Sequence, residues 1–277
     1  MQTPKMINQW TLFTEWFWPK NKTRRAEIKA TLEQNISSIH IDVIVLFCET
    51  KEGLEDIALT KVRIIESQNR LTYNDLFKIA ARDYIGKQVV IANNDISFAQ
   101  FNNFVPDQQT VYPCSRYEWL HKELIWFDDF HNKSNGHERS QDAWFFIAGL
   151  KIHGGFFPMG TPGCDSRLNW LLHESGIELI NVGRMVRLIH NHVETSRNYS
   201  KPMLPSPRMF CNISGVNTFS FHWKKRFLDP TVSWMRNIPI HKYDIVRSLF
   251  SSKAEFYFTT RFYFRRFMKK LNLTDRN

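Results

Sequence analysis

Residues 88–95 read QVVIANND, a short apolar run that passes directly into two amides and a carboxylate. A run of β-branched residues with polar residues at its end is typical of a strand buried on both faces. Ile41–Cys48 (IDVIVLFC) is a second run of this kind. Two such strands predict a sheet that is covered by helices on both sides.

Helix and strand signals alternate around these two runs. We expect strands at residues 10–17 and 62–65, and helices at 24–35 and 73–84, where apolar residues recur every three or four positions. Repeated β-α-β units form a mainly parallel sheet, which binds ligands at the carboxyl ends of its strands. We therefore predict an α/β fold, with residues 93–95 at the ligand-binding edge.

The middle of the chain gives weaker signals. Residues 102–135 show no clean period, whereas 143–147 (AWFFI) predict a strand and 165–175 a helix that ends at Gly176. Two short strands are expected at 178–182 and 185–189.

The charge of the chain is concentrated at one end. Lys and Arg number 37 and Asp and Glu 27, a net charge of +10, and residues 224–277 alone carry 13 basic and 4 acidic residues, or +9. A nearly neutral body with a basic tail favours a tail that attaches to an anionic surface over a protein that is basic throughout.

Neither a secretory signal nor a membrane-spanning run is expected from the sequence, so we predict a cytoplasmic location. The four cysteines stand far apart, which favours free thiols over a disulfide framework or a structural zinc.

Three polar groups are candidates for chemistry. Asn93, Asn94 and Asp95 suit a hard cation or a sugar hydroxyl, although Asn and Asp are also common in solvated turns. Asp165 follows a glycine turn, where it would cap a helix or act as a base; the two roles are compatible. His190 and His192 point to the same side of a strand end, which suits a metal or phosphate.

The order of these segments resembles a known family. The series is R-x-T-Y-x-D at 70–75, ANNDISF at 92–98, SQDAWFF at 140–146, FFPMGTPGCDSRL at 156–168 and H-N-H-x-x-x-x-R-N-Y at 190–199. It resembles bacterial glycosyltransferases of the GT-A type that assemble polysaccharide and lipopolysaccharide, and it covers about residues 12–199. No single motif decides the match, which rests on their order and spacing.

The resemblance implies a Rossmann-like catalytic domain, which we place at residues 1–200. From the charge and aromatic pattern of the tail we expect a basic, mostly helical extension at 201–277, which could associate with a membrane. It implies transfer of a sugar from a nucleotide-sugar to a hydroxyl of a glycan or lipid-linked acceptor, with inversion slightly favoured. The implied site residues fall into three groups. They are Asp165 and Asp142 on the catalytic and acceptor side; Thr14, Arg70, Asp75, Asn93, Asn94, Asp95 and Arg197 for the donor; and Asp95 with His192 or His190 for a divalent cation, Mn²⁺ or Mg²⁺. Asn93 stands where the family usually has a first carboxylate, which weakens the attraction for the ion.

The basic tail at residues 224–277 predicts an anionic membrane surface as a further partner. Aromatic and basic residues in 255–271 suit an interfacial helix on anionic lipid, at the inner face of the cell membrane, and equally a helix packed on the body. No specific nucleic-acid signature accompanies the charge. The competing hypotheses are a metal-dependent phosphohydrolase that uses Asp95, His190 and His192, and a non-enzymatic basic module that binds nucleic acid or membrane.

Overall fold

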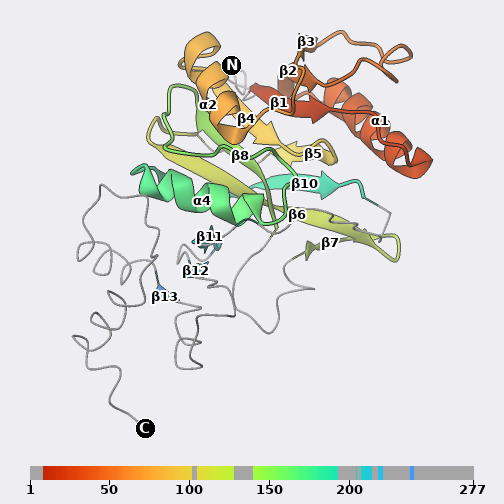
Figure 1. Cartoon of the computed structure of the whole chain (residues 1–277). Helices are drawn as coiled ribbons and strands as arrows, with labels where there is room; N and C mark the ends of the chain where they lie inside the picture. The colour runs from red at the N-terminus through yellow and green to blue at the C-terminus, as the bar shows by residue number, and fades with distance from the viewer. Residues whose placement is uncertain are drawn as a thin grey trace, which may run out of the picture. The chain divides into compact units, whose positions relative to one another are not determined.

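The described part of the chain is built around one large mixed sheet (Figure 1). The structure is a computed structural model that describes residues 9–101, 105–127, 140–192, 204 and 207–213, together with the backbone of 218–220 and 238–239. All of these residues belong to the first of two compact units of the chain, Met1–Pro239. The basic tail beyond residue 240, the helix expected in it, and Arg197 lie outside the described residues.

The large sheet contains ten strands in the order β3-β2-β1-β4-β8-β6-β10-β5, with β7 and β9 paired to β6. Its strands are β1 (Trp10–Trp16), β2 (Ile41–Cys48), β3 (Val62–Glu66), β4 (Gln88–Ala92), β5 (Ile96–Phe101), β6 (Thr110–Leu120), β7 (Glu123–Trp126), β8 (Gln141–Ile147), β9 (Glu178–Leu179) and β10 (Val186–His190). The helices of the described part are α1 (Lys22–Ser37), α2 (Tyr73–Asp83) and α4 (Cys164–Glu174). A small antiparallel sheet contains β11 (Arg208–Phe210), β12 (Thr218–Ser220) and β13 (Ile238–Pro239).

The first half of the sheet is parallel, as the sequence predicts. Strand β1 pairs with both β2 and β4, and β2 pairs with β3, all in parallel. The strand order 3-2-1-4 is that of a doubly wound sheet. Strands β2 and β3 are added on one side of β1 and β4 on the other, so the order of strand addition reverses at β1. The α/β class is therefore confirmed, and the arrangement is consistent with a Rossmann-like fold.

The second half makes the sheet mixed. Strand β8 runs antiparallel to β4 and β6, while β10 runs parallel to β6 and antiparallel to β5. The sheet therefore contains strands that run in both directions. The carboxyl ends of β4, β6 and β10 lie at the same edge of it. Asp95 follows β4, and His190 ends β10, so this edge carries two of the predicted metal ligands.

Helices α1 and α2 cover opposite faces of the sheet. Phe145 of β8 packs edge-on against Trp10 at 4.9 Å, in the core cluster that includes Ile28 and Leu32 of α1. Its neighbour Phe146 stacks on Phe77 of α2 at 4.7 Å. Consecutive strand residues point to opposite faces, so the two helices lie on opposite sides.

Helix α4 begins differently from the prediction. Its N-cap is Gly163, with φ of 77°, and no side chain caps the helix, so the expected capping by Asp165 is wrong. A residue without a Cβ adopts this left-handed conformation readily. Asp165 instead sits inside the first turn, where its Oδ1 accepts a hydrogen bond from the Cys164 thiol at 3.1 Å.

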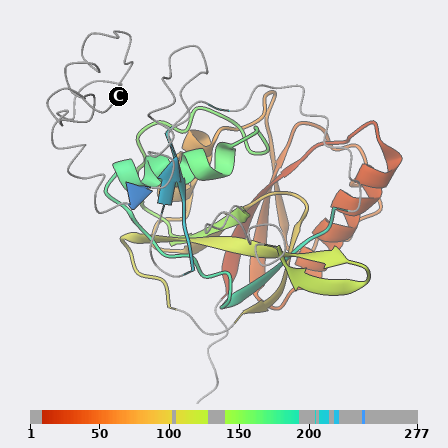
Figure 2. The same ribbon diagram turned by 90° about the horizontal axis from the view of Figure 1, so that it is seen from below.

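Strands β5, β6 and β7 are absent from the prediction. Residues 102–135 gave no clean period, yet β6 and β7 form a hairpin whose turn holds His121 and Lys122 at φ of 48° and 71°. Both views show this hairpin at one end of the long strand β6 (Figures 1 and 2). Pro113 inside β6 weakens the sequence signal, because proline is usually excluded from central strands.

Candidate metal and acid–base site

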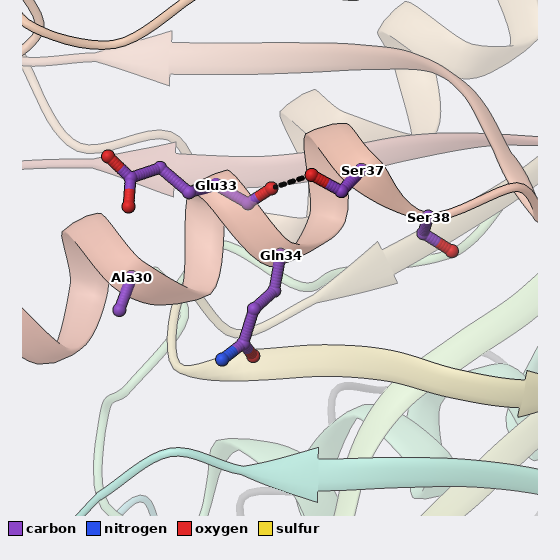
Figure 3. A pocket seen from close by; sticks show the side chains of 5 residues that line it. All are labelled: Ala30, Glu33, Gln34, Ser37 and Ser38. Atoms are coloured by element: carbon purple, nitrogen blue, oxygen red, sulfur yellow. Dashed lines mark hydrogen bonds between the residues drawn. The ribbon is translucent and has the colours of Figure 1, made fainter.

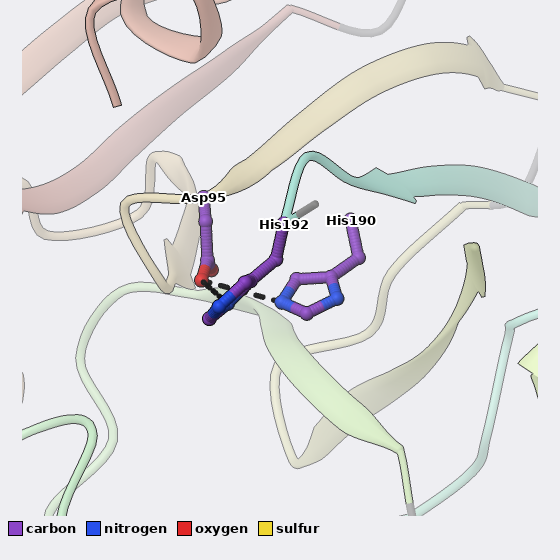
Figure 4. Close-up of side chains that lie close together, drawn as sticks. All are labelled: Asp95, His190 and His192. Atoms are coloured by element: carbon purple, nitrogen blue, oxygen red, sulfur yellow. Dashed lines mark hydrogen bonds and ion pairs between the residues drawn. The ribbon is translucent and has the colours of Figure 1, made fainter. Parts of the chain in front are cut away.

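Three side chains gather at the carboxyl edge of the sheet (Figure 4). Asp95 Oδ2 lies 3.3 Å from His190 Nε2 and 3.7 Å from His192 Nδ1. The possible ligand atoms all lie within 4.8 Å of one another, and Asp95 and His190 are buried. This group could bind a metal ion.

The local backbone fixes these three residues together. The Asn191 amide N–H donates to the Asp95 carbonyl at 2.8 Å, which ties the end of β10 to the turn after β4. The Asn191 side chain donates to Thr31 and to Ser97 at 3.1 and 3.0 Å. Because Asn191 is anchored on both sides, His190 and His192 are held on either side of it, close to Asp95.

Arg24 of α1 supplies a positive charge that the sequence did not reveal. Its Nη2 donates to Asp95 Oδ2 at 2.7 Å, while its Nη1 pairs with Glu27 at 3.0 Å. Burial alone would raise the pKa of Asp95, but His190 and Arg24 outweigh burial and hold that pKa well below 3.8. Asp95 is therefore an ionised, buried carboxylate.

A continuous chain of hydrogen bonds leads away from His190. His190 Nδ1 lies 2.9 Å from Glu118 Oε1, and Arg116 donates to the same oxygen through Nη2 at 2.7 Å. Arg116 Nη1 then reaches Asp142 Oδ2 at 2.6 Å, and Asp142 Oδ1 accepts from the Asn93 amide at 3.1 Å. The chain thus returns to the turn that carries Asp95.

Asp165 interacts electrostatically with two members of this chain, Asp142 and Arg116. Burial, and then repulsion from Asp142, raise the pKa of Asp165 from 3.8 to about 7. A carboxyl with this pKa changes protonation near neutrality, which suits a general base or acid.

Three consecutive polar side chains have an atom without a hydrogen-bond partner among the described residues. These buried atoms are Asn93 Oδ1, Asn94 Nδ2 and Asp95 Oδ1. Native proteins rarely leave such atoms unpaired, so these two acceptor oxygens and one amide donor are available to water or to a bound ligand. One carboxylate and two imidazoles match the donors that Mn²⁺, Fe²⁺ and Zn²⁺ accept, and the residues present fit a divalent ion.

The remaining predicted donor residues lie elsewhere at the sheet edge. Arg70 donates through Nη2 to Glu15 Oε2 of β1 at 2.6 Å, and Thr14 is buried on the same strand. Asp75 caps α2 by accepting from the Thr72 amide and hydroxyl. Among the described residues, no hydrogen bond or ion pair joins Thr14, Arg70 or Asp75 to the Asp95 group.

Sequence reasoning missed Arg24, Arg116 and Glu118. Arg116 and Glu118 stand two residues apart on β6 and so share a face, which is a signal once that strand is recognised. The contact of Arg24 with Asp95 spans 71 positions, and no local pattern reports it.

A surface depression lies along α1 (Figure 3), and one of its lining residues, Gln34, accepts a hydrogen bond from Asn191 at 2.9 Å. It is lined by Ala30, Glu33, Gln34, Ser37 and Ser38. Its single carboxylate and small side chains give no metal or acid–base group to combine with Glu33, so we assign no function to it.

Fold and site together define an α/β protein with a mixed sheet and a largely buried carboxylate–imidazole group, which could bind a metal ion, at the carboxyl ends of β4 and β10. No protein-family model matches the chain, and no curated protein sequence is significantly similar to it. Among the described residues, no helix has the length and apolar character needed to span a membrane.

Proposed function

We propose that the protein is a GT-A type glycosyltransferase, which moves a sugar from a nucleotide-sugar to a hydroxyl of a glycan or lipid-linked acceptor. One observation carries this proposal. A group able to hold a divalent ion and a carboxylate with a pKa of about 7 lie at one edge of the sheet, close enough to interact electrostatically.

The ion side of the site would receive the diphosphate of the donor. Asp95, His190 and His192 would hold Mn²⁺ or a similar ion, which neutralises charge that develops on the departing diphosphate. Arg24 donates to Asp95 Oδ2, the oxygen that faces the two imidazoles, and Asp95 Oδ1 has no hydrogen-bond partner among the described residues. Two imidazoles and one carboxylate favour Mn²⁺ over Mg²⁺, which prefers oxygen ligands.

The surroundings of Asn93 suit an amide at this position, where the resemblance implies a carboxylate. Its amide N–H donates to Asp142, so the side chain is held in place while Oδ1 faces away from that bond. A carboxylate at position 93 would sit beside Asp142 and repel it. The amide therefore fits the charge balance of this site.

Asp165 would act as the base on the acceptor side. The acceptor oxygen forms a bond to the anomeric carbon, the bond from that carbon to the diphosphate oxygen breaks, and the acceptor proton moves to the Asp165 carboxylate. Direct attack of this kind inverts the anomeric centre. Burial, followed by like-charge repulsion from Asp142, holds the pKa of Asp165 near neutrality, while Arg116 donates a hydrogen bond to Asp142 and keeps it in place.

Two single substitutions test the assignment. Asp165→Asn should abolish most sugar transfer and retain binding of a nucleoside diphosphate, because only the proton acceptor is lost. Asp95→Asn should weaken binding of the nucleoside diphosphate in the presence of Mn²⁺ as well. Asp56→Asn, an exposed carboxylate with a side chain 83% accessible, serves as the control. If Asp165→Asn and Asp95→Asn both turn over donor at the parental rate, the proposal is wrong.

A phosphohydrolase is the second candidate, because the Asp95, His190 and His192 group also suits metal-assisted attack of water on a phosphate ester. The two functions differ in their products. A hydrolase releases phosphate without a sugar acceptor, whereas a transferase needs the acceptor for stoichiometric release of nucleoside diphosphate.

A further inference from the structure

We propose that Glu118 is a positioning residue, which fixes the His190 ring so that Nε2 faces Asp95 and the ion held there. The inference rests on the proposed metal site. In the proposed function, Glu118 contacts neither the donor nor the acceptor. Arg116, on the same strand β6, holds Glu118 in place.

The two ring nitrogens of His190 have different partners. Nδ1 lies 2.9 Å from Glu118 Oε1, whereas Nε2 lies 3.3 Å from Asp95 Oδ2. A histidine that binds a metal through Nε2 must carry its proton on Nδ1, and that proton needs an acceptor. Glu118 is placed to be this acceptor.

The sheet sets this contact by register. His190 pairs directly with Glu118 across the parallel strands β10 and β6, so their side chains leave the sheet on the same face. The pairing extends through Leu188 and Arg116. The register of β10 against β6 therefore places the two side chains next to each other, with no loop required to bring them together.

Arg116 holds Glu118 in turn. Its Nε and Nη2 donate to Glu118 Oε1 at 2.9 and 2.7 Å, and its Nη1 donates to Asp142 at 2.6 Å. The guanidinium also lies over the Phe127 ring, 4.4 Å from its centroid. With a side chain only 7% exposed, Arg116 has little freedom to release either carboxylate.

Two carboxylates thus flank His190 in different roles. Asp95 would bind the ion together with His190 Nε2, while Glu118 Oε1 lies within hydrogen-bond distance of both His190 Nδ1 and Arg116. Glu118 Oε1 thus presents a carboxylate oxygen to the Nδ1 proton of His190 while Arg116 holds it from the other side. An ionised acceptor on Nδ1 also makes Nε2 a stronger ligand.

The test compares metal affinity in Glu118→Gln and Glu123→Gln. Glu123 is an exposed glutamate of the same hairpin, on β7, and makes a matched control. The full chain is titrated with Mn²⁺ by calorimetry and with Co²⁺ by visible absorption, which reports the ligand geometry. Glu118→Gln should weaken binding by roughly 10- to 100-fold and change the Co²⁺ spectrum, while Glu123→Gln leaves both as in the parent.

Arg116→Lys provides a second variant if Glu118→Gln does not fold. A lysine cannot hold both carboxylates as the guanidinium does, so a smaller loss of Mn²⁺ affinity is expected. Parental affinity and Co²⁺ spectrum in every folded variant would overturn the inference. So would a parent chain that binds neither ion.

These results are separable from the test of function. Failure of the positioning role leaves metal binding and sugar transfer by the parent intact. Failure of the proposed function appears instead as a chain that binds the ion and turns over no nucleotide-sugar.

Discussion

Removing the carboxylate at Asp165 should change how the stability of the protein depends on pH. In the folded chain the pKa of Asp165 is about 7, against an ordinary value of 3.8, because burial and Asp142 disfavour the charged form. The folded state therefore holds this proton more tightly than the unfolded state. The free energy of unfolding must fall as the pH rises from about 4 to 7, and be level above that range.

The magnitude follows from the pKa. Each pH unit in the window is worth about 1.4 kcal/mol, so between pH 5 and pH 8 Asp165 should remove about 3 kcal/mol. Asparagine has no proton to lose at this position. The stability of Asp165→Asn relative to the parent should therefore increase by about 3 kcal/mol between these two pH values.

Urea unfolding at pH 5 and at pH 8 measures this difference. Comparison of parent and variant cancels the pH dependence of the other groups, and Asp56→Asn controls for removal of a negative charge from the surface. A relative stability that is the same within about 0.5 kcal/mol at both pH values would refute the claim that Asp165 is a neutral-pH carboxyl. The transfer activity of the parent should rise with pH through about 7, as the base ionises.

Three further predictions concern stability and attachment. Thr72→Ala removes the capping box of α2 and should cost about 1 kcal/mol, measured by urea unfolding; an unchanged midpoint would contradict the cap. Gly155→Ala should destabilise more than Gly86→Ala, because both have positive φ but only Gly155 would place a Cβ 3.2 Å from the Asn74 nitrogen; equal losses in thermal unfolding would contradict this. Deletion of residues 240–277, the second compact unit, should weaken cosedimentation with anionic vesicles at least roughly tenfold while leaving nucleoside diphosphate binding unchanged. Full vesicle binding by the truncated chain would argue against an attachment role.

The parallel half of the fold is predictable because its elements carry strong local signals. The apolar runs at Ile41–Cys48 and Gln88–Ala92 become β2 and β4 with the expected bounds. Helix α2 is likewise marked by a clear apolar stripe and by the Thr72 cap. In each case one short window of sequence contains the physical reason for the element.

The other half of the fold could not be predicted from the sequence, because its strands are stabilised by neighbours that are distant in sequence. Strand β6 pairs with β8, β10, β7 and β9, and residues 110–116 are buried on both faces of the sheet. A strand that is buried on both faces needs no alternating pattern. It also contains Pro113, which opposes a strand assignment. Residues 102–135 therefore read as irregular.

The candidate site divides in the same way. The rule for parallel sheets placed Asp95 at the carboxyl ends of the strands, alternation put His190 and His192 on one side of a strand end, and the family resemblance suggested that the three act together. Their charged partners, Arg24 on α1 and Glu118 on β6, contact Asp95 and His190 only in the folded chain. The sequence therefore indicated the ligands and could not indicate the charges around them.

Binding of nucleoside diphosphates tests the central claim most directly. The melting temperature of the full chain is measured with a panel of nucleoside diphosphates, each with and without Mn²⁺. One of them, at 100 times its Kd, should stabilise the protein by about 2.7 kcal/mol, and raise the melting temperature by roughly 5 °C or more, only when Mn²⁺ is present. Asp95→Asn should remove this shift. If no nucleoside diphosphate raises the melting temperature with any divalent ion, the protein is not a metal-assisted glycosyltransferase.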